Sequence, residues 1–381
     1  MSNFKLAALT LIRVVLNTAY RMIYPFLAVF ARGLGVDIGV VSGLVANRAI
    51  VGAVTPFIFP FIETRGRKFG MSLGLGLFVL AMGIVALFPS LTTLGVALIL
   101  AMVGKTIFDP SMTSYVADHV AYEKRGTAIA ISEFAWSLAF ILGIPAVGWI
   151  IAKSTWSAPF WMLGILGLAA IVFILTTLQD STKPTRHADG VFGSVKAILT
   201  TPAVLVALSI GACICSANEV VNLVFGVWLE DSFHLQITAL AGASIVIGLS
   251  ELGGEGLVAL FVDRMGKVRA AGVGIVANSI AAVLLPMIGH TELGALIGLF
   301  LFFISFEFTI VSIIPLMSEV MPSARATTLA LTVSANFIGR AIGALLAPGL
   351  YRYGIYTVMG AAAFFDLLAL VAVWYVSKHH E

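Results

Sequence analysis

Long apolar runs restrict this chain to one class of fold. The runs are roughly 20 to 30 residues long, and about 20 residues suffice for a helix to cross the ~30 Å hydrocarbon layer of a membrane. A membrane β-strand needs only about 10 residues. Hydrophobic residues make up 60% of the chain and charged residues 11%, which leaves too little polar surface to cover a water-soluble protein. The sequence therefore predicts an all-α integral membrane protein.

Twelve such runs are predicted to be transmembrane helices. The first run is too long for the core of a signal peptide, so we keep it as a span. The longest polar connection divides six spans from six. We predict an N-terminal six-helix bundle over residues 1–178, a cytoplasmic linker over 179–200 and a C-terminal six-helix bundle over 201–381. The predicted spans are 6–31, 38–61, 69–89, 92–117, 126–152, 158–178, 201–229, 237–262, 269–289, 293–318, 326–351 and 355–376.

Basic residues are distributed unevenly between the two ends of these spans. With the N-terminus in the cytoplasm, 14 Lys and Arg residues fall on inner segments and 3 on outer segments. Because cytoplasmic loops of membrane proteins carry such an excess, we predict a multi-pass protein of the plasma (inner) membrane with both termini in the cytoplasm. The net charge of +3 is then a topology signal. We expect the lipid bilayer, and no nucleic acid, as a partner.

A charged hairpin occurs twice, 200 residues apart. Residues 63–67 read Glu-Thr-Arg-Gly-Arg and residues 263–267 read Asp-Arg-Met-Gly-Lys. In each, an acid is followed three residues later by Gly and then by a cation, which suits a tight turn because Gly permits unusual backbone angles. Arg125 and Arg325 keep the same offset. Repetition between the halves of a membrane protein is a feature of secondary transporters.

Charged side chains also lie within the predicted spans. Each costs about 2.5 to 3.5 kcal/mol in hydrocarbon, so these side chains must face protein or water. Spans three, six and nine contain none, if Arg269 at the first residue of span nine is counted with the inner segments, as above. We therefore expect spans 3, 6, 9 and 12 to face lipid and the other eight to surround a central polar cavity. The embedded residues are Arg13, Arg21, Arg48, Lys105, Asp109, Glu133, Glu219, Glu251, Glu255, Glu307, Arg340 and Asp366.

The hairpins and the embedded charges resemble the major facilitator superfamily (MFS) over almost the whole chain. The family's hairpin signature is Gly-x-x-x-Asp-(Arg/Lys)-x-Gly-(Arg/Lys), and the second hairpin fits it with Ala259 at the first Gly. The resemblance implies the MFS fold, two pseudo-symmetric six-helix bundles that work by alternating access, with a conformational latch at the hairpins. The latch residues that the resemblance implies are Glu63, Gly66, Arg67, Asp263, Arg264, Gly266, Lys267 and Arg125.

Within this superfamily, the fifth span is most similar to proton-linked, drug-exporter-like members. Gly143-x-Pro145-x-x-Gly148 resembles their Gly-Pro-x-x-Gly kink, although Ile144 separates the Gly from the Pro. The chain also lacks the buried Arg expected near residue 100 of the fourth span. Close helix packing and a bend are the alternative explanation for the three residues.

The substrate candidates are polar residues on the spans that are expected to line the cavity. Arg13, Asn17, Arg21 and Tyr24 follow one another at steps of three or four and share a helical face. Arg21 and Arg48 can bind a carboxylate, phosphate or sulfate group together; alternatively, each pairs internally with Asp109 or Glu133. The predicted substrate-binding residues are Arg21, Tyr24, Arg48, Asn17, Trp136, Asn218, Asn336 and Arg340.

Embedded acids are the candidates for proton coupling. Lys105 and Asp109 are four residues apart and are expected to pair on one helical face. Glu251 and Glu255 also share a face, and two neighbouring carboxylates are not easily ionised together in a low dielectric. For each acid the alternative is structural pairing, and we expect Asp366 to turn inward against Ser or backbone groups. The candidates are Glu251, Glu255, Glu219, Glu307, Asp109 and Glu133.

These observations predict a secondary active transporter for a small organic molecule, anionic or zwitterionic and amphipathic, that works by alternating access. We expect proton antiport and efflux, with the proton gradient as driving force, no cofactor, no metal and a monomeric chain. The alternative is a uniporter, or a lipid or lysolipid translocator, without proton coupling. An intramembrane enzyme or receptor is disfavoured because the chain has no His-Glu-x-x-His and no Gly-x-Ser-x-Gly motif.

Overall fold

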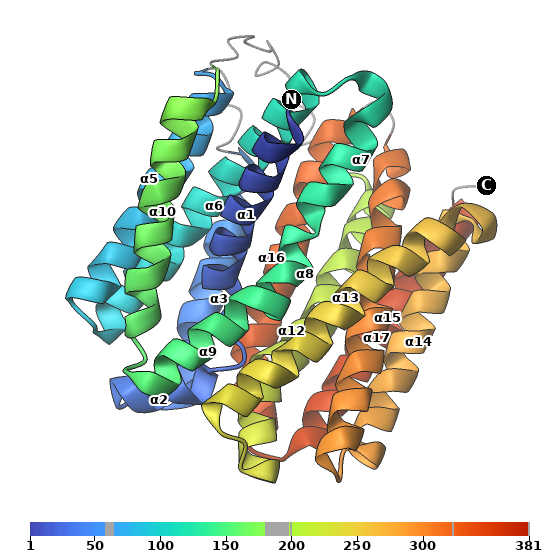
Figure 1. The fold of residues 1–381 in the computed structure, drawn as a ribbon. Helices are drawn as coiled ribbons and strands as arrows, with labels where there is room; N and C mark the ends of the chain where they lie inside the picture. The colour runs from blue at the N-terminus through green and yellow to red at the C-terminus, as the bar shows by residue number, and fades with distance from the viewer. Residues whose placement is uncertain (58–64, 180–197, 199, 322–323, 380–381) are drawn as a thin grey trace. The chain divides into compact units, whose positions relative to one another are not determined.

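The computed structural model describes the chain except for residues 58–64, 180–197, 199, 322–323 and 380–381. Over the described ranges every regular element is a helix (Figure 1). Eleven helical segments in these ranges are long and apolar enough to cross a membrane. The predicted all-α membrane fold is therefore confirmed.

The chain forms two compact units. Unit 1 contains residues 1–36, 54–188 and 237–248, and unit 2 contains residues 37–53, 189–236 and 249–381. This division differs from a single cut at residues 179–200, because residues 37–53 cluster with unit 2 and residues 237–248 with unit 1. The two six-helix bundles stay a prediction, and most of the predicted linker lies outside the described residues.

Unit 1 is built on the N-terminal helices. Helix α5 packs against both α6 and α10, and α1 packs against α6, α7 and α8 (Figure 1). The first half of α13 (Ile237–Met265) completes the unit. Its other elements are α1 (Asn3–Arg21), α2 (Leu27–Leu34), the 3₁₀ turn Thr55–Phe57, α5 (Arg67–Leu87), α6 (Leu91–His119), α7 (Tyr122–Glu133), α8 (Ala135–Leu138), the π-helix Ala139–Gly143, α9 (Ile144–Lys153) and α10 (Ala158–Thr177).

The first predicted span, residues 6–31, consists of two helices. A turn over residues 22–26 separates α1 from α2, and it contains Pro25, which has no N–H to donate to a helical hydrogen bond. Met22 still donates its N–H to the Thr18 carbonyl, and Phe30 donates to Phe26. The first predicted span is therefore not one continuous helix, and it is not among the eleven segments that are long and apolar enough to cross a membrane.

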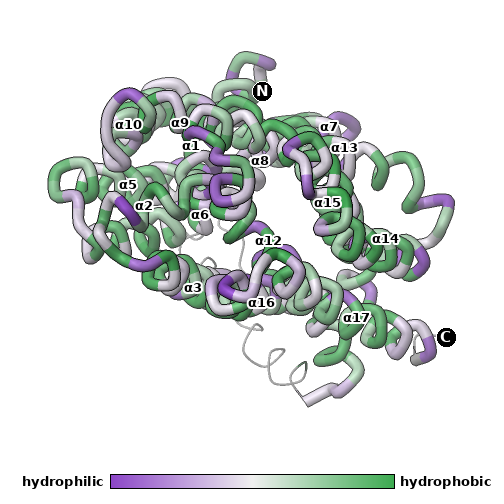
Figure 2. Tube along the Cα trace, turned by 90° about the horizontal axis from the view of Figure 1, so that it is seen from below, coloured by the Kyte–Doolittle hydropathy of each residue, from purple (hydrophilic) through white to green (hydrophobic). Residues whose placement is uncertain are grey.

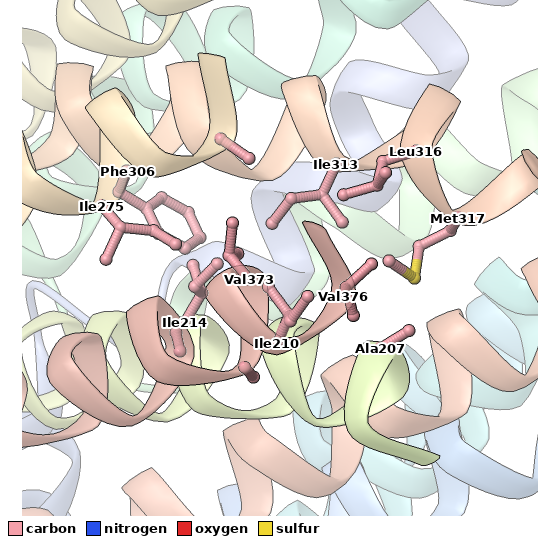
Figure 3. Close-up of a cluster of buried hydrophobic side chains, with 13 residues drawn as sticks. Ala207, Ile210, Ile214, Ile275, Phe306, Ile313, Leu316, Met317, Val373 and Val376 are labelled. Atoms are coloured by element: carbon pink, nitrogen blue, oxygen red, sulfur yellow. The ribbon is translucent and has the colours of Figure 1, made fainter. Parts of the chain in front are cut away.

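Unit 2 surrounds an apolar core that four helices share. Ile210 and Ile214 of α12, Ile275 of α14, Phe306 of α15 and Val373 of α17 all belong to this buried cluster (Figure 3). The unit is composed of α3 (Ile38–Val54), α12 (Pro202–Phe233), the second half of α13, α14 (Lys267–Ile288), α15 (Glu292–Val320), α16 (Arg325–Tyr351) and α17 (Ile355–His379).

The glycines of the two repeated hairpins have similar backbone conformations. Gly66 precedes α5 with φ of 97°, and Gly266 precedes α14 with φ of 81°. Side chains other than Gly are strained at such angles, so the predicted need for Gly is confirmed. The repetition extends into the helices: Gly74 packs against Gly104 on α6, and Gly274, 200 residues later, packs against Thr309 on α15.

Wide apolar faces are exposed on helices that were expected to meet lipid. Trp161 and Val172 of α10, Val273 and Ile280 of α14, and Val371 of α17 each expose more than half of their surface. The tube of α14 is green, meaning hydrophobic, along most of its length (Figure 2). Such faces suit contact with acyl chains. The cavity expected between the other helices stays a prediction.

Candidate functional site

Arg13 joins two acids inside unit 1. Its Nη1 donates to Glu133 Oε1 at 2.7 Å and to the Ser132 carbonyl at 3.1 Å, and its Nε lies 3.3 Å from Asp109 Oδ1. The Arg13 and Asp109 side chains are largely buried, whereas that of Glu133 is 47% exposed. One guanidinium is thus shared between an enclosed carboxylate on α6 and an accessible carboxylate on α7.

Lys105 extends this cluster along α6. Its Nζ lies 2.5 Å from Asp109 Oδ2, which confirms the predicted pair one turn apart, and donates to Asn17 Oδ1 at 2.6 Å. The Asn17 Nδ2 atom is buried and has no hydrogen-bond partner among the described residues. Buried amide groups are nearly always satisfied by protein, water or ligand. Asn17 therefore has a donor available for a further partner.

Arg21 lies one turn beyond Asn17 on α1, between two aromatic rings. Its guanidinium carbon is 4.2 Å from the centre of the Trp136 ring and 3.7 Å from that of Phe140, and Nη1 donates to the Trp136 carbonyl at 3.1 Å. Cation–π contacts of this kind stabilise a desolvated guanidinium. Tyr20 also contacts Trp136, with ring centres 5.7 Å apart. The predicted stripe Arg13–Asn17–Arg21 is thus assembled with Trp136.

A π-helix shapes the fifth span next to this cluster. It covers Ala139–Gly143 and ends two residues before Pro145, and single π turns are frequent at functional sites. A side chain at Gly143 would collide with Thr18, and one at Gly148 would come within 2.9 Å of Phe26 and would also meet Ala241. Close helix packing, which was the alternative explanation of Gly143 and Gly148, is therefore observed.

Unit 2 contains a second buried ion pair. Arg340 of α16 donates to Glu219 of α12 at 2.9 Å, and the Glu219 side chain is 1% exposed. The helices approach closely here, because a Cβ at Gly343 would lie 2.7 Å from Glu219 Cβ. Buried amide atoms of Asn218 and Asn336 have no hydrogen-bond partner among the described residues. These predicted substrate residues lie on the same two helices as the ion pair.

The ion pairs of the two units have opposite polarity. In unit 1 the cation, Arg13, is on the first span and the acid, Glu133, is on the fifth. In unit 2 the acid, Glu219, is on the seventh span and the cation, Arg340, is on the eleventh. The separations along the chain are 120 and 121 residues. Equivalent helices of the two repeats are therefore joined by pairs with exchanged charges.

The remaining predicted acids and cations of the spans are buried or half-buried in protein, as expected for groups that lipid does not solvate. Glu251 of α13 and Glu307 of α15 are both buried, and Glu255 is half-buried. Glu307 packs against Gly254, one turn beyond Glu251. Arg48 is buried on α3 in unit 2, so the structure assigns it and Arg21 to different units. Tyr24 is buried in unit 1, and its ring lies 6.4 Å from that of Tyr20.

Asp366 of α17 is a buried acid with no ion pair among the described residues. It is 1% exposed, as predicted for an inward-turned side chain. Ser279 of α14 is close, but neither carboxylate oxygen makes a hydrogen bond of ordinary geometry within the described chain. Asp366 therefore turns inward beside Ser279, as predicted.

The predicted latch residues lie at the ends of the helices. Arg67 Nε is 3.5 Å from Asp118 Oδ2 near the end of α6, and Lys267 pairs with Glu319 near the end of α15. Arg125 donates to the Val120 carbonyl at 3.2 Å. Asp263 and Arg264 are exposed, and Glu63 lies outside the described residues. The two hairpins are thus fixed by equivalent ion pairs.

Two participants were not among the predicted site residues. Arg13 was placed on the polar stripe but not among the binding residues, and Phe140 was not considered. Trp136 and Phe140 are four residues apart, a spacing that indicates a shared helical face. Among the described residues, no three His, Cys, Asp or Glu side chains are arranged to hold a metal ion.

An all-helical membrane fold with an internal repeat and buried inter-helical ion pairs defines a multi-pass protein of the secondary transporter class. A sequence model of the Major Facilitator Superfamily matches residues 9–344. The chain belongs to this superfamily.

The chain is similar to other proteins and to solved structures, over most of its length or over part of it. YceJ, an uncharacterized MFS-type transporter of Bacillus subtilis (strain 168), is 23% identical over 380 residues, which is 96% of this chain and 94% of that protein. Multidrug resistance protein 2 of the same organism is 30% identical over 161 residues, 42% of this chain and 40% of that protein. A crystal structure of the peptide transporter POT superposes with a TM-score of 0.79 at 14% identity, covering 99% of this chain and 96% of that one.

Proposed function

We propose that this MFS transporter exports a small amphipathic organic molecule in exchange for protons. The observation that carries the proposal is the sharing of Arg13 between the enclosed Asp109 and the accessible Glu133. An accessible acid can exchange protons with water. Protonation of Glu133 removes its charge, so the ion pair between Arg13 and Asp109 becomes stronger. Asp109 then binds Lys105 less tightly.

The substrate is proposed to bind beside this cluster. Arg21 supplies a cation, Trp136 and Phe140 supply apolar surface, and Asn17 supplies an amide with a donor available. Together these groups match a ligand that carries an anionic group next to an apolar body. Export is supported by relatives, since Multidrug resistance protein 2 of Bacillus subtilis (strain 168) and quinolone resistance protein NorA of Staphylococcus aureus are among them.

The first test is transport into proteoliposomes with and without an imposed pH gradient. Probes are norfloxacin as a zwitterion, taurocholate as an anionic amphiphile and ethidium as a cation. We expect a gradient that is acidic inside to drive accumulation of norfloxacin or taurocholate but not of ethidium. Equal transport of the accepted probe without a gradient would instead identify a uniporter.

The second test assigns the acid. Glu133→Gln is expected to reduce gradient-driven accumulation to the level without a gradient while substrate exchange across the membrane continues. Glu123→Gln, which changes an exposed acid on the same helix, is the matched control and should leave coupling intact. If Glu133→Gln remains coupled and Glu251→Gln or Glu255→Gln does not, the proton site lies in unit 2.

A further inference from the structure

A groove in the surface of unit 2 has no role in the proposed transport cycle. It has a volume of about 480 Å³ and lies between the second half of α13, α14 and α15. Phe261, Val273 and Ile280 line it and are themselves more than 40% exposed. The groove is therefore open toward the surroundings of the protein.

The lining is suited to hydrocarbon. Among the lining residues the polar side chain is Ser305, and its hydroxyl already donates to the Leu301 carbonyl at 2.7 Å and accepts from Asn278 at 3.0 Å. No polar group of the lining thus requires a polar ligand. Ala277 lies at the centre of the α14 wall, where its small side chain leaves room for an occupant.

The length of the groove matches one leaflet of a bilayer. On α14 it extends from Val273 to Leu284, which is about 16 Å along a helix. Half of a hydrocarbon layer is about 15 Å thick. The groove begins near the hairpin between α13 and α14, since Met265 is also part of its lining.

Basic side chains lie at the end of the groove near the α13–α14 hairpin. Arg269 precedes Val273 by one helical turn, and the series Arg269, Val273, Ala277 shares one face of α14. Arg264 follows Phe261 by three residues and lies on the groove side of α13, whereas Asp263 lies two residues from Phe261 and faces away. Both arginines are exposed, and Lys267 pairs with Glu319. This end of the groove therefore favours an anionic group.

We propose that the groove binds one acyl chain of an anionic phospholipid, with the phosphate headgroup held by Arg269. The lipid is in the leaflet on the side of the α13–α14 hairpin. It fills the space between α13, α14 and α15 as a tightly bound structural lipid and does not exchange freely with the bilayer. A juxtamembrane Arg contributes about 1 kcal/mol to binding of anionic lipid, which corresponds to about a fivefold change in Kd.

The test is lipid binding to the purified full-length protein, titrated with phosphatidylglycerol or phosphatidylcholine of the same chains and followed by native mass spectrometry. We expect the wild type to bind one phosphatidylglycerol more tightly than phosphatidylcholine. Ala277→Phe, which fills the groove, should weaken binding of both lipids. Arg269→Gln should weaken binding of phosphatidylglycerol about fivefold and of phosphatidylcholine less, because the choline cation already offsets the phosphate charge of phosphatidylcholine.

Matched controls separate the groove from the general surface. Val276→Phe adds the same ring to an exposed position of α14 outside the lining, and Arg325→Gln removes an exposed cation at the start of α16; neither should change binding. Wild-type affinity for both lipids in Ala277→Phe would overturn the proposal. So would a shift of Ala277→Phe from dimer to monomer, because the occupant would then be a second copy. Unchanged lipid preference in Arg269→Gln would overturn the headgroup assignment.

Discussion

At the scale of single residues, the charges of the Arg13 cluster are balanced. Arg13 and Lys105 provide two cations, and Asp109 and Glu133 provide two acids. Asp109 contacts both cations, whereas Glu133 contacts only Arg13 within this cluster, so Asp109 compensates more positive charge. A buried pair is often no more stable than an apolar replacement, but the removal of one partner leaves an uncompensated charge.

Asp109→Asn should therefore lower the free energy of unfolding by about 3 kcal/mol. The double variant Lys105→Met/Asp109→Asn, in which the charges balance again, should recover most of this loss. The measurement is the thermal unfolding midpoint of the purified protein in one detergent. A double variant that is less stable than Asp109→Asn would show that Lys105 is required independently of Asp109.

Asp366 provides the control for this prediction. It is a buried acid of α17 without an ion pair among the described residues, so Asp366→Asn keeps the shape of the side chain and leaves no cation uncompensated. We expect its unfolding midpoint to equal or exceed that of the wild type. A decrease as large as that of Asp109→Asn would mean that amide substitution itself, and not the lost ion pair, causes the effect.

At the scale of helices, small residues determine which faces meet. Gly254 of α13 lies directly against α15: a Cβ there would be 2.7 Å from Glu307 Cβ and 2.9 Å from the Ile304 carbonyl. Gly256, two residues further along, is exposed and has no side-chain or backbone neighbour within 4 Å of such a Cβ. The same substitution at these two positions therefore separates the effect of helix packing from the effect of helix propensity.

Gly254→Leu should lower the free energy of unfolding by about 1 to 3 kcal/mol, because overpacking forces neighbouring backbones apart. Gly256→Leu should be neutral or slightly stabilising, since Gly is a poor helix former and the new side chain would enter open space. Thermal unfolding of both variants in the same detergent provides the comparison. Equal effects at the two positions would argue against close contact between α13 and α15.

The helices were largely predictable from the sequence, and their partners were not. Apolar length placed the spans, and the Gly66 and Gly266 turns followed from residue chemistry. The interruption near Pro25 was missed because the residues around it are as apolar as a continuous span. Asp109 and Glu133 were considered as internal partners of Arg21 and Arg48, and no partner was predicted for Arg13, because pairing depends on how α1, α6 and α7 pack. The structure shows that Arg13 contacts both acids.

At the scale of the whole molecule, the distribution of cations predicts the orientation in the membrane. The connection between α6 and α7 should be cytoplasmic and the connection between α14 and α15 should be outside. Lys124 lies in the first turn of α7 and His290 lies in the turn after α14, and both are exposed. Cys213 and Cys215 lie within α12, so their replacement gives a background without thiols.

In that background, a membrane-impermeant maleimide should label His290→Cys in intact cells and Lys124→Cys only after the cells are made permeable. Labelling is read from the mass shift of the purified protein. The permeable cells serve as the positive control for both positions. The reverse pattern would place the N-terminus outside and would contradict the predicted topology.

The charges of the first helix also affect how the chain is made. Helix α1 leaves the ribosome with Arg13 and Arg21, and the translocon accepts a central Arg only at a cost of about 2.5 to 3.5 kcal/mol. Glu133 and Trp136, which contact these arginines, are synthesised 120 and 115 residues after them. Because these partners are synthesised so late, α1 cannot reach its final depth in the membrane until the fifth span has emerged from the ribosome. Insertion of the N-terminal segment therefore depends on a helix that is made later.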